Sequence, residues 1–215
     1  MTRAIVFDFD GVLVDSVNVK TEAYVRLFED EKPEILQQIV TYHLENSGVS
    51  RVEKFRYYYG HLLRRHLSDK KLDELCRRFE ELVLERVVRA LWVPGALEAL
   101  EGCRQNKLLM FIASGTPEDE LRVIAQRRGL SSYFHGIYGS PAVKPEIIRS
   151  ILSTHKLKPS EVLFVGDGMT DYEAAQATGT HFVARGDPEN ARRWSDLGVA
   201  MLPDLRGLPE YIERF

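Results

Sequence analysis

The sequence is poor in cysteine: only Cys76 and Cys103 occur among its 215 residues, and no Cys-x-x-Cys pair is present. Two cysteines in a chain of this length do not make a disulfide framework, which favours a reducing compartment. The apolar run after Arg3 stops at Asp8, which is too short for a secretory signal. No stretch approaches the roughly 18 apolar residues that span a bilayer. We therefore expect a cytoplasmic protein with no membrane partner.

The sequence also lacks an excess of basic residues, and its net charge is −3. This argues against a general nucleic-acid binder, which usually carries a basic surplus. A glycine-rich phosphate loop with the Walker spacing is absent. His61 and His66 are five residues apart, about 140° around a helix, so they do not share a metal on one face. Hydrophobic residues make up 44% of the chain, enough for a globular core.

Two kinds of pattern occur along the chain. Residues 4–7 are an apolar, partly β-branched run that predicts a buried strand within residues 2–9. Apolar residues at helical spacing then predict helices only, at 17–30, 33–46, 51–66 and 69–90. After residue 92, strands expected at 108–113, 137–139, 162–165, 181–184 and 199–201 alternate with helices at 117–128, 144–155 and 170–177.

Strands that alternate with helices indicate an α/β fold with a parallel sheet covered on both faces. We therefore predict a Rossmann-like core formed by residues 1–15 and 91–215. A helical bundle formed by residues 16–90 is inserted into that core.

Polar side chains gather where the predicted strands end. In an open parallel sheet, ligands bind outside the carboxyl ends of the strands. The residues expected at that edge are four acids, one lysine and one hydroxyl: Asp8, Asp10, Asp167, Asp171, Lys144 and Ser114. Each of them alone is an ordinary turn, cap or surface residue; the joint arrangement is what chance does not readily produce.

Four neighbouring carboxylates repel one another and stay ionised only near positive charge. Oxygen ligands of this kind suit Mg²⁺, and Lys144 adds further compensation. A divalent cation, a lysine and exposed backbone N–H groups make a site for a dianionic phosphoryl group. Asp8 could attack phosphorus while Asp10 exchanges a proton with the leaving oxygen, and Gly11, directly after them, permits the tight backbone path. The sequence therefore predicts phosphoryl-transfer chemistry.

Together these segments resemble the haloacid dehalogenase superfamily of phosphohydrolases, in its phosphoglycolate phosphatase and β-phosphoglucomutase-like branch. The matching segments are Asp8-Phe9-Asp10-Gly11-Val12, Ser114, Lys144 and Gly166-Asp167-Gly168-Met169-Thr170-Asp171. They occur in the family's order and cover nearly the whole chain. The third segment departs from the common pattern, since Lys144 is followed by Pro145-Glu146 rather than Pro-x-Pro-Asp.

The resemblance implies a role for each matching residue. Asp8 would be the nucleophile that forms an aspartyl-phosphate, and Asp10 the general acid and base. Ser114, the adjoining Gly115 and Lys144 would bind the phosphoryl oxygens. Mg²⁺ would be held by Asp8, the backbone carbonyl of Asp10, Asp167 and Asp171. The inserted helices would form a mobile cap, and the protein would be a monomer acting on a small phosphorylated metabolite.

The cap loop Gly48-Val49-Ser50-Arg51 is similar to that of β-phosphoglucomutases, and there Arg51 would contact a distal phosphate. A phosphohexomutase is thus an alternative. However, the first signature continues with Val14-Asp15-Ser16 and Lys20, where those mutases have Thr-Asp-Thr and a histidine. A non-catalytic binding protein is a third interpretation, disfavoured because Asp8 and Asp10 are both present. The sequence favours a hydrolase.

Overall fold

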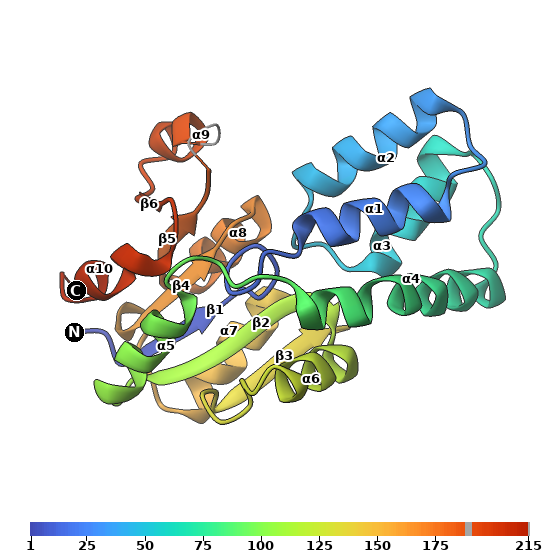
Figure 1. Cartoon of the computed structure of the whole chain (residues 1–215). Helices are drawn as coiled ribbons and strands as arrows, with labels where there is room; N and C mark the ends of the chain where they lie inside the picture. Colours follow the sequence, from blue (N-terminus) through green and yellow to red (C-terminus); the bar gives the residue numbers. More distant parts are fainter. Residues whose placement is uncertain (188–190, 215) are drawn as a thin grey trace.

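The computed structural model describes residues 1–187 and 191–214, and a six-stranded sheet forms its centre (Figure 1). The strand order is β3-β2-β1-β4-β5-β6, and every pair is parallel. The strands are β1 (Ala4–Phe7), β2 (Leu109–Pro117), β3 (Gly136–Ser140), β4 (Val162–Gly166), β5 (His181–Arg185) and β6 (Met201–Leu202). The predicted α/β fold with a parallel sheet is confirmed.

The short strand β1 occupies the middle of the sheet because it is apolar on both sides. Alternate residues of a strand point to opposite faces. Ile5 and Phe7 pack into the core on one face, and Ala4 and Val6 into the core on the other. All four side chains are fully buried. A strand buried in this way fixes the position of the residues that follow it.

Helices cover both faces of the sheet. Residues of α5 and α6 share one core with Ile5 and Phe7, whereas residues of α7 and α8 pack on the opposite face. The helices of this part are α5 (Ala96–Gln105), α6 (Glu118–Arg127), α7 (Lys144–Thr154), α8 (Met169–Thr178), α9 (Ala191–Asp196) and α10 (Leu208–Ile212). The sequence pattern had not indicated α5, α9 or α10.

The inserted segment forms a bundle of four α-helices, which we call the cap: α1 (Val17–Leu27), α2 (Pro33–Glu45), α3 (Arg51–Tyr57) and α4 (Asp69–Arg89). Ser50 and Ser68 cap α3 and α4, each accepting a hydrogen bond from the backbone N–H three residues later. Helix α3 is shorter than expected, since residues 58–62 continue it as a π-helical turn. Tyr58 of this turn is fully buried, in the aromatic core of the cap.

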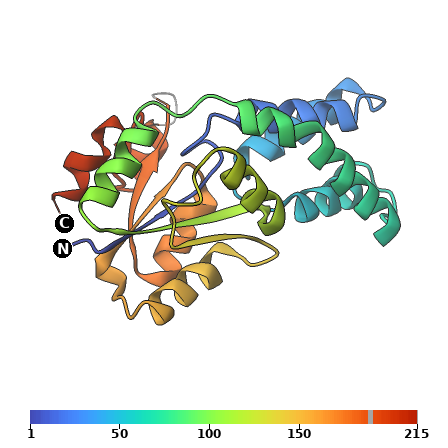
Figure 2. The ribbon, with the colours of Figure 1, turned by 60° about the horizontal axis from the view of Figure 1, so that its bottom comes forward.

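Two connecting segments of the chain join the cap to the core. They pair with each other, because Asp15 N–H donates to Leu91 O at 2.9 Å and Val93 N–H donates to Leu13 O at 3.1 Å. The cap lies at one end of the sheet, and the chain termini lie near each other at the opposite end (Figures 1 and 2). Within the described residues, no helix is both long and apolar enough to cross a membrane.

Candidate active site

The end of β1 and the first turns of α7 and α8 bring three predicted residues into direct contact. Asp8 is the first residue after β1, and its Oδ2 accepts a hydrogen bond from Lys144 Nζ at 2.8 Å. Lys144, the first residue of α7, also donates to Asp171 Oδ1 in the first turn of α8. The three side chains are at most 5% exposed. A lysine thus joins two carboxylates from different segments beneath the cap.

Asp167 completes a group of acids around the same point. Oxygen atoms of Asp8, Asp167 and Asp171 lie within 4.8 Å of one another. Oδ1 of Asp167 is buried and has no hydrogen-bond partner. A converging set of carboxylate oxygens with one unpartnered member fits a hard divalent cation such as Mg²⁺.

Gly11 makes the room for Asp167. A Cβ atom at position 11 would lie 2.2 Å from Asp167 Oδ2, and the backbone of Gly11 has φ +78°, in the left-handed region. The glycine of the first signature is therefore required twice, by its backbone conformation and by the carboxylate packed against it.

Proton affinities in this group reflect crowding of negative charge. Burial, together with the charge of Asp171, raises the pKa of Asp8 to about 6 despite the opposing effect of Lys144. Burial and the charges of Asp8 and Asp171 likewise raise the pKa of Asp167. Burial alone would lower the pKa of Lys144, but the two carboxylates that it contacts raise it. Lys144 is therefore charged. Its single positive charge does not balance the three neighbouring carboxylates, so a bound cation would be needed to keep all of them ionised.

Asp10 has separate surroundings from Asp8. Its Oδ1 accepts a hydrogen bond from Ser16 Oγ at 2.7 Å, and its Oδ2 accepts from Thr116 Oγ1 at 2.9 Å and from Lys20 Nζ. Burial would raise the pKa of Asp10, but Lys20 and these hydrogen bonds lower it below its ordinary value. The two acids of the first signature thus differ in charge environment, as acids with different roles require.

The cap reaches the core at two glycines. A Cβ atom at Gly48 would lie 1.9 Å from Thr170 Oγ1 and 3.0 Å from Lys144 Nζ, and one at Gly115 would lie 2.5 Å from Gly48 O. Ser114 is buried beside this contact, with its Oγ accepting a hydrogen bond from Thr116 N–H at 3.2 Å. The predicted phosphate-binding residues Ser114 and Gly115 therefore lie directly beneath the cap loop.

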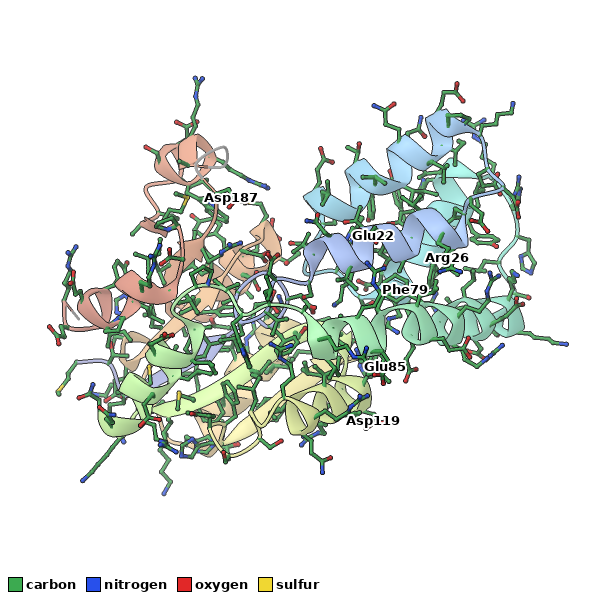
Figure 3. All side chains as sticks on the ribbon, viewed as in Figure 1. Glu22, Arg26, Phe79, Glu85, Asp119 and Asp187 are labelled. Carbon is green, nitrogen blue, oxygen red and sulfur yellow. The ribbon has the colours of Figure 1, made fainter. Side chains whose placement is uncertain are left out.

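Arg51 also crosses from the cap to the core. Its Nη2 lies 2.7 Å from Glu120 Oε2 and donates to Oε1 at 2.8 Å. Its guanidinium lies 4.7 Å from the centroid of the ring of Phe79, a residue of α4 that Figure 3 labels on the side facing α1. The side chains of Arg51 and Glu120 are 5% and 3% exposed. The charge of Arg51 is therefore already matched within the protein.

Comparison with known proteins agrees with this geometry. The model of the haloacid dehalogenase-like hydrolase family matches residues 5–185. The chain belongs to this family. A phosphoglycolate phosphatase of Photorhabdus laumondii is 30% identical over 183 residues, covering 82% of this chain and 77% of that protein. A phosphorylated carbohydrates phosphatase of Thermotoga maritima is 29% identical over 186 residues, covering 82% of both chains.

Solved structures support the same fold. The β-phosphoglucomutase of Clostridium difficile aligns with a TM-score of 0.79 over 100% of this chain and 96% of its own, at 17% identity. An identity this low speaks for the fold alone. The resemblance to the haloacid dehalogenase family stated from the sequence is confirmed.

Two residues of the site were not predicted from the sequence. Lys20 and Thr116 both bind Asp10, and Lys20 Nζ also donates to Thr116 Oγ1 at 2.8 Å. Sequence spacing could have indicated both residues. Lys20 is four residues after Ser16, so the two lie on the same side of the first turn of α1. Thr116 is two residues after Ser114, which places both on the same side of a strand.

Proposed function

We propose that this protein is a Mg²⁺-dependent phosphatase that hydrolyses a small phosphorylated metabolite through an aspartyl-phosphate intermediate. Membership of the haloacid dehalogenase-like hydrolases, with phosphatases among its relatives, identifies it as a phosphatase-type hydrolase. The observation that carries the mechanism is the separation of Asp8, paired with Lys144, from Asp10, paired with Lys20. Asp8 is held beside Lys144 for attack, whereas Asp10 is held by a separate set of hydrogen-bond donors.

The proposed reaction has two halves. A carboxylate oxygen of Asp8 forms a bond to phosphorus while the bond from phosphorus to the alcohol oxygen breaks, and Asp10 gives that oxygen a proton. Asp10 then takes a proton from water as the water oxygen attacks phosphorus, which releases phosphate and restores the Asp8 carboxylate. Ser114, the Gly115 backbone and Lys144 hold the phosphoryl oxygens. Asp8, the carbonyl of Asp10, Asp167 and Asp171 would hold Mg²⁺, which would supply positive charge to neutralise those oxygens.

The charge state of Asp10 fits the second half directly. Its lowered pKa keeps it ionised without substrate, and this is the form that accepts a proton from water. For the first half it must be protonated. A phosphate dianion entering beside Asp10 would shift its pKa upward, toward that protonated form, because a nearby like charge disfavours the carboxylate.

A panel of phosphorylated metabolites, together with p-nitrophenyl phosphate, tests the proposal. We expect turnover that requires Mg²⁺ and that Asp8→Asn abolishes. Asp15→Asn is the matched control, since Asp15 is an exposed acid in the same segment and should leave the rate unchanged. Absence of turnover by the wild-type protein on the whole panel would support a non-catalytic binding protein. Turnover that survives Asp8→Asn would rule out the covalent mechanism.

The phosphohexomutase alternative needs its own assay. We expect a hexose 1-phosphate, supplied with a trace of hexose bisphosphate, to give free phosphate. Hexose 6-phosphate as the main product would instead identify a mutase. The position at which those mutases carry a histidine is here Lys20, paired with Asp10, which is why hydrolysis is preferred.

Other expectations from the sequence also stay predictions. They are a cap domain at residues 16–90 on a core of residues 1–15 and 91–215, a monomeric state, a cytoplasmic location and the absence of a nucleic-acid partner.

A further inference from the structure

A small cavity lies between the cap and the catalytic acids. Its volume is about 30 Å³, and core residues on one side include Asp8, Asp10 and Ser114. The cap supplies three basic residues to its wall: Lys20, Arg51 and Lys54. Gly48 of the cap loop packs against Thr170 and Gly115 of the core beside this cavity, so the structure shows the cap closed against the core.

Two of the three cap cations are already neutralised. Lys20 is paired with Asp10, and Arg51 is paired with Glu120. Lys54 differs, because no carboxylate of the described residues forms an ion pair with it. Its Nζ lies 2.9 Å from His43 Nδ1, with the carbonyl oxygens of His43 and Ser47 at 3.4 and 3.5 Å. All three partners are uncharged acceptors, since burial and the charge of Lys54 lower the pKa of His43 and keep its ring neutral.

Lys54 is also one of the most deeply buried side chains, at 1% exposed. Burying an ammonium group without an opposite charge is unfavourable. Burial and the neighbouring Lys20 accordingly lower the pKa of Lys54 to about 7. An anionic group arriving in the cavity would remove this disadvantage. The cation is held in place for such a group by His43, which packs against the ring of Tyr24 at 4.8 Å between centroids.

We propose that Lys54 binds a second anionic group on the substrate, at the end away from the phosphoryl group that is transferred. The substrate class is then a phosphate monoester whose alcohol portion carries its own negative charge. This inference rests on the proposed phosphatase function and adds the chemistry of the leaving group. His43 acts as the positioning residue for Lys54.

The arrangement of the site supports this direction of binding. Asp8, Ser114 and Lys144 of the core take the phosphoryl end, whereas Lys54 belongs to α3 of the cap. Lys54, Asp8 and Ser114 line the same small cavity, which favours a substrate whose second charge lies only a few atoms from the ester oxygen. A carboxylate meets this requirement, and a second phosphate presents the same chemistry on a larger group.

The test compares substrates that differ only in the second charge. For the carboxylate, 2-phosphoglycolate is paired with ethylene glycol monophosphate; for the second phosphate, fructose 1,6-bisphosphate is paired with fructose 6-phosphate. We expect the wild-type protein to prefer the doubly charged member of at least one pair. In Lys54→Met we expect kcat/KM for that member to fall about ten- to a hundred-fold more than for its partner. The pair that responds identifies the second anion.

A ratio of two kcat/KM values does not depend on the fraction of folded enzyme, so a partly unfolded variant still gives an answer. Lys54→Gln is a second variant that keeps a polar end at this position. Arg56→Met is the matched control, because Arg56 is an exposed cation on the same helix, and it should leave the ratio unchanged.

Equal loss on both members of each pair, or no wild-type preference, would overturn the assignment of Lys54 while leaving the phosphatase intact. If the wild-type protein hydrolyses none of the four substrates nor p-nitrophenyl phosphate, the proposed function fails, and the assignment of Lys54 fails with it.

Discussion

The ion pair between Arg51 and Glu120 should hold the cap closed, and Glu120→Gln tests this. With nitrogen and oxygen 2.7 Å apart, the attraction at an effective dielectric constant of about 20 is about 6 kcal/mol. Desolvation of the two charges offsets much of that attraction. Removing one member leaves the other buried and unpaired, which costs about 3–5 kcal/mol as long as the cap stays closed.

The cap can avoid this cost by opening, since Arg51 then reaches water. The loss should therefore appear mainly as a shift from the closed to the open form. At 1.4 kcal/mol for each factor of ten, 3 kcal/mol corresponds to about a hundred-fold in the equilibrium between the two forms. Global unfolding should change much less.

Hydrogen exchange measures this opening. We expect Glu120→Gln to speed exchange of the backbone amides in residues 47–49 and 114–116, where cap and core meet, and to leave those of β1 unchanged. The matched control is Glu85→Gln. Glu85, labelled in Figure 3, joins α4 of the cap to α6 of the core through Arg127, as Arg51 joins α3 to α6. Its side chain, however, is 54% exposed. Exposed pairs contribute about 0–1 kcal/mol. If both variants change the exchange equally, or neither does, the closing role of Arg51 is refuted.

Two further predictions concern the cluster of acids. Gly11→Ala places a methyl group 2.2 Å from Asp167 Oδ2 at φ +78°, so we expect a loss of about 1–3 kcal/mol in stability and weaker Mg²⁺ binding, both read from thermal unfolding at increasing Mg²⁺. Gly60→Ala, with no atom within 4 Å, should show neither effect. The second concerns pH: because the pKa of Asp8 rises from 3.8 to about 6 on folding, its protonated form stabilises the metal-free protein below pH 4. That contribution, up to about 3 kcal/mol, is lost as pH rises to 6. Mg²⁺ should therefore raise the melting temperature more at pH 7 than at pH 5, and an equal rise at both would contradict this account.

The parts of the site that the sequence predicted are those set by local chain geometry. Asp8 follows directly on a strand whose four residues are all buried, so its place at the sheet edge follows from the pattern of β1. In the same way, Asp167 directly follows β4, and Asp171 lies in the first turn of α8. Lys144 begins α7, as the preference of proline for the first helical turn indicates for the Lys144-Pro145 segment.

Other features could not be predicted because they depend on weak local signals. Helix α5 follows Gly95 at φ +80° and has no side-chain cap, so nothing marks its start. Strand β2 extends to Pro117, beyond its expected end, through an irregular register with β3. Residues 58–62 satisfy a helical pattern, and that pattern does not distinguish the π-helical turn that they form from an α-helix.

Contacts between residues far apart in the sequence are the remaining features that could not be predicted. Arg51 and Glu120 are 69 residues apart, and Lys20 and Thr116 are 96 apart. Sequence patterns report which residues share a strand edge or a helix face, but not which cap residue meets which core residue. The partner of each charged side chain in the cap is therefore known only from the structure.

This limit matters most for substrate recognition. Similarity of the cap loop assigned the distal anion to Arg51, three residues before Lys54 on the same helix. In the structure Arg51 has a carboxylate partner, and Lys54 has only neutral ones. An anion that approaches Arg51 has to displace Glu120, whereas an anion that approaches Lys54 meets an uncompensated charge. The closed cap thus separates two functions that one cap helix carries: Arg51 fastens it to the core, and Lys54 is left to select the substrate.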